Sequence, residues 1–338
     1  MKPEDRKTPA KTTAAEARDL ARALRGGDRR ALARAITLIE STRADHRRAA
    51  DRLLRAILPH TGGSIRLAVS GVPGVGKSTF IEALGLHVIE GGRRVAVLAV
   101  DPSSPRAGGS ILGDKTRMEA LSRNARAFIR PSPAGGTPGG VARRTREALL
   151  ACEAAGFDVV IVETVGVGQS EFAVADMVDM FLLLLAPVGG DDLQGIKKGI
   201  MELADVVIVN KADGVLSTAA ERTRADFSAA LGLMRPASPD WVPSVMTCSA
   251  LTGAGIGEVW GLVKQFNDAM TGAGHLQSRR ADQARAWMWN EVTETLMDRL
   301  RADGRARQVV TAMEEEVAAG KRSPTEAAQA ILAAFLDG

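Results

Sequence analysis

The sequence predicts an α/β fold with a mostly parallel sheet and helical extensions at both ends. Between about residues 64 and 266, short β-branched runs alternate with helical stretches, and several runs are apolar throughout, as in strands buried on both faces. A glycine-rich turn also joins the first of these runs directly to a helical stretch. The expected strands are Ile65–Ser70, Arg94–Val100, Val159–Val162, Met180–Leu185, Val206–Val209 and Val245–Cys248.

The regions on either side of the sheet are predicted to be helical. After Ala14 apolar residues recur at helical spacing, and Asp28 stands where a helix N-cap is expected. Near the other end an apolar residue stands at every fourth position from Ala284 to Leu300, and Ser323–Glu326 reads as a capping box. The predicted parts are a disordered lead at 1–13, a helical segment at 14–62, the sheet domain at 63–270 and a helical arm at 275–338.

Composition argues against several classes of protein. The chain has 338 residues, 45% of them hydrophobic, and a net charge of +4. It has no Lys/Arg block with interleaved aromatic residues, so no nucleic-acid partner is expected. No apolar run approaches the ~20 residues of a membrane span, and the polar lead does not resemble a signal peptide. Cys152 and Cys248 are far apart, which predicts no disulfide framework and favours a reducing, cytoplasmic location.

A phosphate-binding loop is the strongest local signal. Gly71–Ser78 matches G-x-x-x-x-G-K-[ST] in full, and it lies between an expected strand and an expected helix. The glycines let backbone N–H groups turn toward a phosphate, and the helix N-terminus adds positive potential. Lys77 is expected to reach the β- and γ-phosphates, and the Ser78 hydroxyl to bind Mg²⁺. The residues expected to contact nucleotide here are Gly71, Gly74, Val75, Gly76, Lys77, Ser78 and Thr79.

A second motif predicts which base is bound. Asn210-Lys211-Ala212-Asp213 follows the strand Val206–Val209, and the Asp213 carboxylate can accept two N–H groups of guanine, whereas adenine offers no such pair. Cys248-Ser249-Ala250-Leu251, after the next strand, resembles the loop that supports the base in GTPases. The sequence therefore predicts a GTPase that binds GTP or GDP. The expected base-site residues are Asn210, Lys211, Asp213, Ser249, Ala250 and Leu251.

Acidic residues at strand ends predict a magnesium site. Asp101 and Glu163 each end an expected strand, and strand carboxyl ends face the nucleotide in this architecture. Gly166 follows Glu163 where most GTPases carry Asp-x-x-Gly, so its N–H is expected to sense the γ-phosphate. The expected metal-site residues are Ser78, Asp101, Asp114 and Glu163.

Further charged residues are candidates for catalysis. Asp114 could position water or Mg²⁺ and Lys115 could neutralise transition-state charge, although a solvated loop would have the same composition. Gln169 could orient the attacking water, and the loop before Lys197 could sense a partner. The candidate catalytic set is Lys77, Asp114, Lys115, Glu163, Gln169 and Lys197.

Several long strings resemble the MeaB/ArgK family of G proteins over about residues 60–270 and into the helical ends. They are Asp101–Pro105, Gly109–Met118, Glu163–Glu171, Gly195–Gly199 and Asn210–Asp213. The resemblance implies a G domain of the dimer-forming, SIMIBI-like branch of P-loop GTPases. Family members are chaperones that gate cofactor loading of adenosylcobalamin-dependent methylmalonyl-CoA mutase and protect it, with GTP hydrolysis as the timer.

By matching position, the resemblance implies particular roles. Asp101, Asp114 and Glu163 would lie at Mg²⁺ and the switches, and Lys197 in an additional switch loop that responds to the mutase. The C-terminal helices resemble the family's dimerisation arm, so a homodimer is expected. The chain has no D-x-H-x-x-G cobalamin signature, and we expect that the isolated protein does not bind cobalamin.

Two other functions remain open from the sequence. One is a kinase that transfers the γ-phosphate to a small molecule or protein. The base-selecting motif at Asn210–Asp213 argues against a kinase. The other is a metallochaperone GTPase of the nickel-insertion kind, against which the sparse His and Cys residues speak.

Overall fold

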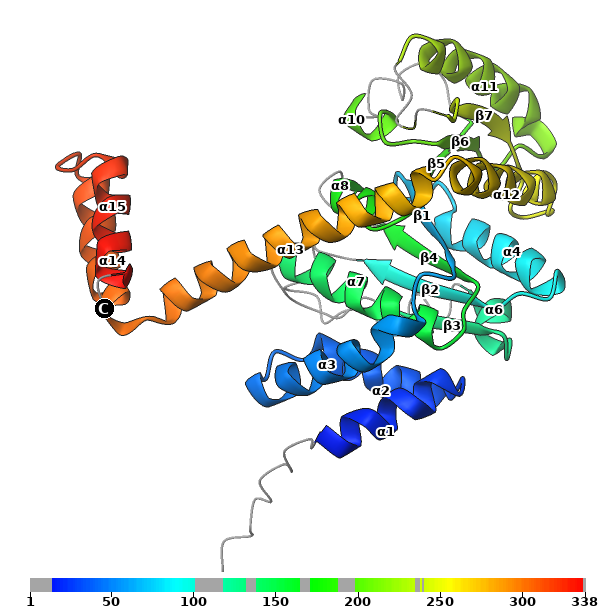
Figure 1. The fold of residues 1–338 in the computed structure, drawn as a ribbon. Coiled ribbons are helices and arrows are strands. Elements are labelled where there is room, and N and C mark those ends of the chain that lie inside the picture. Colours follow the sequence, from blue (N-terminus) through cyan, green and yellow to red (C-terminus); the bar gives the residue numbers. More distant parts are fainter. Residues whose placement is uncertain are drawn as a thin grey trace, which may run out of the picture. The chain divides into compact units, whose positions relative to one another are not determined.

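The computed structural model describes residues 14–100, 118–131, 138–164, 171–187, 198–234, 238 and 240–336. Seven parallel strands form one sheet in the order β3-β2-β4-β1-β5-β6-β7 (Figure 1). The strands are β1 (Ile65–Gly71), β2 (Val95–Val100), β3 (Ala127–Arg130), β4 (Val159–Thr164), β5 (Met180–Leu185), β6 (Val206–Val209) and β7 (Ser244–Thr247). The predicted fold class, a mostly parallel α/β sheet with helical extensions, is confirmed.

The strand β3 is absent from the strands that the sequence predicts. It has only four residues and ends in Arg130, so its pattern does not stand out from a loop. Its register with β2 pairs Val95 with Ala127 and Leu98 with Arg130. β3 is an edge strand that pairs with β2, and its four residues are too short a run to be recognised as a strand in the sequence.

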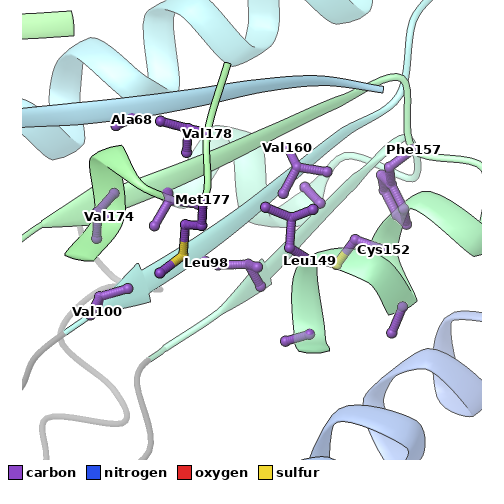
Figure 2. Close-up of a cluster of buried hydrophobic side chains, with 14 of the residues drawn as sticks. Ala68, Leu98, Val100, Leu149, Cys152, Phe157, Val160, Val174, Met177 and Val178 are labelled. Atoms are coloured by element: carbon purple, nitrogen blue, oxygen red, sulfur yellow. The ribbon is translucent and has the colours of Figure 1, made fainter. Parts of the chain in front are cut away.

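Helices cover both faces of the sheet, and each face has its own apolar layer. The first layer joins the sheet to α4 (Lys77–Glu90), α6 (Glu119–Arg123) and α12 (Ile256–Gly272), the second to α7 (Pro138–Ala154) and α11 (Ser217–Gly232). Within β1, Leu67 and Val69 belong to the first layer and Ala68 to the second. Figure 2 shows part of the second, where Leu98 and Val160 of the sheet lie near Leu149 and Cys152 of α7. Burial on both faces explains why the strand sequences are apolar throughout.

The amino-terminal helices extend the second layer. They are α1 (Ala14–Arg25), α2 (Arg29–Glu40) and α3 (Ala44–Ile57), followed by a 3₁₀ turn at Leu58–His60, and they pack on α7. The expected N-cap is confirmed, since Asp28 Oδ1 accepts hydrogen bonds from Arg30 N at 2.8 Å and Ala31 N at 3.3 Å. The buried stripe of α2 is made by Leu32, Ile36 and Ile39.

Buried ion pairs hold the amino-terminal edge of the sheet. Glu153 of α7 accepts hydrogen bonds from Arg66 Nε and Nη2, each at 2.9 Å, and from Ser64 Oγ at 2.6 Å. Asp179, just before β5, accepts from Arg280 Nε at 2.8 Å and Nη2 at 2.6 Å. Removing one partner of such a buried pair costs about 3–5 kcal/mol. The pair of Asp179 with Arg280 fixes the second turn of α13 (His275–Ala302) to the sheet domain.

The chain divides into two compact units, Met1–Arg280 and Ala281–Gly338. In the second unit α14 (Gly304–Ala318) packs against α15 (Pro324–Leu336). The predicted capping box is confirmed: Ser323 N donates to Glu326 Oε2, and Glu326 N donates to Ser323 Oγ, both at 3.2 Å. In the part of the chain that the structure describes, no helix combines the length and apolar character needed to span a bilayer.

Asp205, at the start of β6, is a buried carboxyl group. Its Oδ2 accepts a hydrogen bond from Phe181 N at 2.8 Å, and its Oδ1 accepts one from Ser238 Oγ at 3.4 Å. Burial raises the pKa of Asp205 to about 6, although Arg279 and these two hydrogen bonds act in the opposite direction. The folded protein therefore holds the proton more tightly than the unfolded chain does.

This pKa makes the stability depend on pH. The stabilising contribution of protonated Asp205 is complete below pH ~4, the unfolded pKa, and is lost as pH rises through the folded pKa. We expect Asp205→Asn to remove this dependence. The free energy of unfolding of the variant should therefore rise relative to that of wild type by about 2 kcal/mol between pH 4 and pH 6. Urea denaturation across this range measures the change, with the substitution Asp226→Asn at an exposed position of α11 as the control. Parallel curves for wild type and Asp205→Asn would contradict the expectation.

Candidate nucleotide site

The phosphate loop, Gly71–Ser78, lies between the end of β1 and the start of α4. Gly71, Gly74 and Gly76 have φ values of 149°, 83° and 96°. A Cβ on Gly71 would lie 2.4 Å from the carbonyl oxygen of Leu184, and one on Gly76 would lie 2.8 Å from Asn210 Nδ2. Both positions therefore require glycine for space as well as for backbone conformation.

Lys77 begins α4 and folds over this loop. Its Nζ donates hydrogen bonds to the carbonyl oxygens of Gly71 at 2.7 Å and Val72 at 3.2 Å. Burial lowers the pKa of Lys77, while the charges of Glu163 and Glu171 oppose the shift by favouring the ammonium form. A partly desolvated cation at the end of a phosphate loop is well placed to exchange its carbonyl partners for phosphate oxygens.

Ser78 and Glu163 meet across the site, 85 residues apart in sequence. Ser78 Oγ donates a hydrogen bond to Glu163 Oε1 at 3.1 Å. Glu163 is the penultimate residue of β4, which ends at Thr164. Thr164 Oγ1 in turn donates to Ser70 Oγ at 2.8 Å, and both residues are buried, so β4 is tied to β1 beside the loop. A hydroxyl and a carboxylate oxygen at this separation fit the oxygen ligands that Mg²⁺ prefers.

The expected base-site residues converge on the same loop. Asn210 Nδ2 donates to the carbonyl oxygen of Val75 at 3.0 Å, while its Oδ1 accepts from Ala250 N at 3.0 Å. Lys211, at φ 62°, donates from Nζ to the carbonyl oxygen of Gly74 at 2.8 Å. The ends of β6 and β7 are thus joined to the phosphate loop.

The carboxylate of Asp213 is oriented by its neighbour. Ser249 Oγ donates to Asp213 Oδ1 at 2.6 Å, and Ser249 is itself buried. Leu251, two residues further on, is 81% exposed. This arrangement leaves Asp213 Oδ2 available for a base, with an exposed apolar side chain beside the supporting loop.

The structure also identifies neighbours of the site to which no motif in the sequence points. Ser70 and Thr164 form the cross-strand hydrogen bond beside the loop, and the charge of Glu171 acts on Lys77. In the sequence Glu171 stands only at the end of the string Glu163–Glu171, and nothing local marks it as a residue whose charge acts on Lys77.

Six of the predicted site residues lie outside the described residues. They are Asp101, Asp114, Lys115, Gly166, Gln169 and Lys197. Their roles stay predictions. Among the described residues there is no group of three or more His, Cys, Asp or Glu side chains arranged to hold a metal ion.

Comparisons with known proteins agree on one family. The model of the family described as methylmalonyl-CoA mutase-associated GTPase MeaB matches residues 32–305. A putative GTPase of Caulobacter vibrioides is 57% identical over 91% of this chain and 94% of its own length. The methylmalonic aciduria type A homolog, mitochondrial, of Mus musculus is 49% identical over 91% of this chain and 77% of its own length. The crystal structure of an LAO/AO transport system kinase, 40% identical, superposes with a TM-score of 0.77 over 94% of this chain and 97% of that one.

Proposed function

Because the chain belongs to the MeaB family of methylmalonyl-CoA mutase-associated GTPases, we propose that it is a GTP-hydrolysing chaperone of an adenosylcobalamin-dependent methylmalonyl-CoA mutase. In this role it gates cofactor loading of the mutase and protects the enzyme, with GTP hydrolysis as the timer. The observation that carries the proposal is the family match over residues 32–305, which spans the whole nucleotide site. The mouse relative, whose name refers to methylmalonic aciduria, supports it.

The described residues supply most of a GTP site. Asp213 accepts the N–H groups of guanine while Ser249 holds it in place, and Asn210 fixes the base loop to the phosphate loop. The N–H groups of the loop and the Lys77 ammonium bind the phosphate oxygens. Substrate binding therefore breaks the Lys77 hydrogen bonds to Gly71 and Val72 and replaces them with charge-assisted ones.

Ser78 and Glu163 are the described residues that would hold Mg²⁺, with Asp101 and Asp114 as further acidic candidates. The ion, when bound, supplies positive charge to the phosphate oxygens. Glu163 is fixed by its strand and by Ser78, so it can orient water at the phosphate end without a conformational change. Gly166 and Gln169 are proposed to complete this end of the site, and Lys115 to neutralise developing charge.

The first test is GTP turnover by the full chain with and without methylmalonyl-CoA mutase, with ATP as the control. We expect slow basal hydrolysis of GTP, a higher rate with the mutase, and no comparable activity with ATP. A rate that the mutase leaves unchanged would contradict the chaperone function. Radiolabel from the γ-phosphate should appear only as inorganic phosphate, and label on any acceptor would point to the kinase alternative.

We further propose a cytoplasmic protein that does not bind cobalamin alone. Both cysteines are buried, and burial raises the pKa of Cys248 to about 12, so neither is set up for disulfide chemistry. Cobalamin spectra that change on addition of the isolated protein would contradict the second part.

An exposed apolar face on α13 supports a homodimer. Met288, Val292 and Leu296 are 52%, 40% and 51% exposed and stand four residues apart on one helix face. We expect Met288→Glu with Leu296→Glu to weaken self-association by at least about tenfold, because each change places a charge in an apolar contact. Sedimentation equilibrium measures the dissociation constant, with Leu233→Glu in the first unit as the control. An unchanged dissociation constant would place the dimer contact elsewhere.

A further inference from the structure

The short helix α8 (Glu171–Ala175) joins the phosphate site to another surface segment. It follows directly on residues 165–170, which carry Gly166 and Gln169. Glu171, Val174 and Ala175 are buried, and the helix packs against β1 and β4, the strands that lead into the phosphate loop and carry Glu163. One side of α8 is therefore fixed to the part of the core that shapes the site.

Glu171, on this buried side of α8, interacts electrostatically with Lys77 of the phosphate site. Its side chain is fully buried, and its charge favours the ammonium form of Lys77. Charges that are shielded from water interact more strongly than exposed ones do. A small shift of α8 therefore changes the field at the residue that is expected to contact the β- and γ-phosphates.

The other side of α8 carries Phe172, which is 51% exposed. Its ring lies on Gly199, in α10 (Lys198–Met201): a Cβ added to Gly199 would be 3.0 Å from Phe172 Cζ. A side chain at residue 199 would therefore push the Phe172 ring aside by a few tenths of an ångström. Met201, at the end of α10, is buried in the same apolar layer as Val174 of α8. Helices α8 and α10 are thus in contact through the ring of Phe172 and the backbone of Gly199, two residues that are 27 positions apart in the sequence.

We propose that Phe172 is a positioning residue that links α10 to the phosphate site, so that a partner acting on α10 alters GTP hydrolysis through α8. The inference rests on the proposed function, and on the resemblance that implies a mutase-responsive loop at Lys197, immediately before α10 in the sequence. Gly199 has no side chain that could change its rotamer, so a movement of α10 should shift the Phe172 ring directly. Movement of this ring should in turn shift α8, which carries Glu171.

The test measures mutase stimulation, the ratio of GTP turnover with and without methylmalonyl-CoA mutase, in full-length variants. We expect Phe172→Ala and Gly199→Ala each to lower the maximal stimulation about threefold to tenfold. The half-saturating mutase concentration should not change, because the proposed contact transmits a signal and does not bind the partner. Phe172→Leu, which keeps an apolar side chain over Gly199, should restore most of the stimulation.

A double-mutant cycle makes the test specific. The double variant should be no worse than Phe172→Ala alone, because a Cβ at residue 199 has no ring to displace. Leu233→Ala, which truncates another exposed apolar side chain in the same unit, is the control and should behave as wild type. Circular dichroism melts check that each variant is folded.

Four outcomes would overturn the inference. Full stimulation of both single variants would show that the contact transmits nothing, and independent, multiplying losses in the double variant would show that the two residues do not act through each other. A raised half-saturating concentration with full maximal stimulation would make Phe172 a docking residue instead. If wild type itself is not stimulated, the proposed function fails and this inference fails with it.

Discussion

Asp213→Asn is expected to exchange the base preference of the protein from guanine to xanthine. The Asp213 carboxylate accepts two N–H groups of guanine, whereas the Asn amide offers one acceptor and one donor, which suits the carbonyl that xanthine carries in place of the guanine amino group. A polar group left unpaired in a desolvated site is costly, so the ratio of kcat/KM for GTP to that for XTP should fall by at least about 10³-fold.

The neighbouring contacts should let Asp213→Asn change the base contact without moving the side chain. Ser249 Oγ donates to Asp213 Oδ1 at 2.6 Å, and an Asn Oδ1 can accept the same hydrogen bond, so the side chain should stay in place. Asp226→Asn, on the exposed face of α11, is the matched control and should retain the GTP preference. If Asp213→Asn still prefers GTP, the base is read elsewhere.

Lys77→Ala has the second large expected effect, on hydrolysis rather than base choice. The Lys77 ammonium is partly buried at the end of the phosphate loop, and its present partners are two backbone carbonyl oxygens that can also bind water. Loss of a positioned charge at transferring phosphoryl groups costs about 10²–10³-fold, so kcat/KM for GTP should fall by that factor. Single-turnover measurements would separate the loss in chemistry from the loss in binding.

The matched control for this change is Lys264→Ala on α12, which removes an exposed ammonium that makes none of the phosphate-loop contacts. Its activity should equal that of wild type. A Lys77→Ala variant with unchanged kcat/KM would mean that the loop binds something other than a nucleoside triphosphate.

Some of the site could be predicted from sequence because its signals are local. The phosphate loop is a continuous string of eight residues, and its glycines are required by backbone angles within that string. The capping box at Ser323–Glu326 and the N-cap at Asp28 were predicted for the same reason, since each satisfies N–H groups at most three residues away.

Other features depend on contacts between distant strands. β3 has only four residues and pairs with β2, and the charge of Glu171 acts on Lys77 because α8 packs on β1 and β4. The contact of Phe172 with Gly199 is likewise invisible in the sequence, because a glycine close to a ring looks like any other glycine.

The sequence by itself determined the fold class, the nucleotide and the family, because the apolar pattern and the motif strings are short-range properties of the chain. Only the tertiary structure decided how the motifs act together. Asn210 reaches the phosphate loop across 135 residues, and Ser78 reaches Glu163 across 85. The physical reason is that side chains from separate strands meet only when the sheet sets their order and register, and a hydrogen bond of about 3 Å leaves no tolerance for a different register.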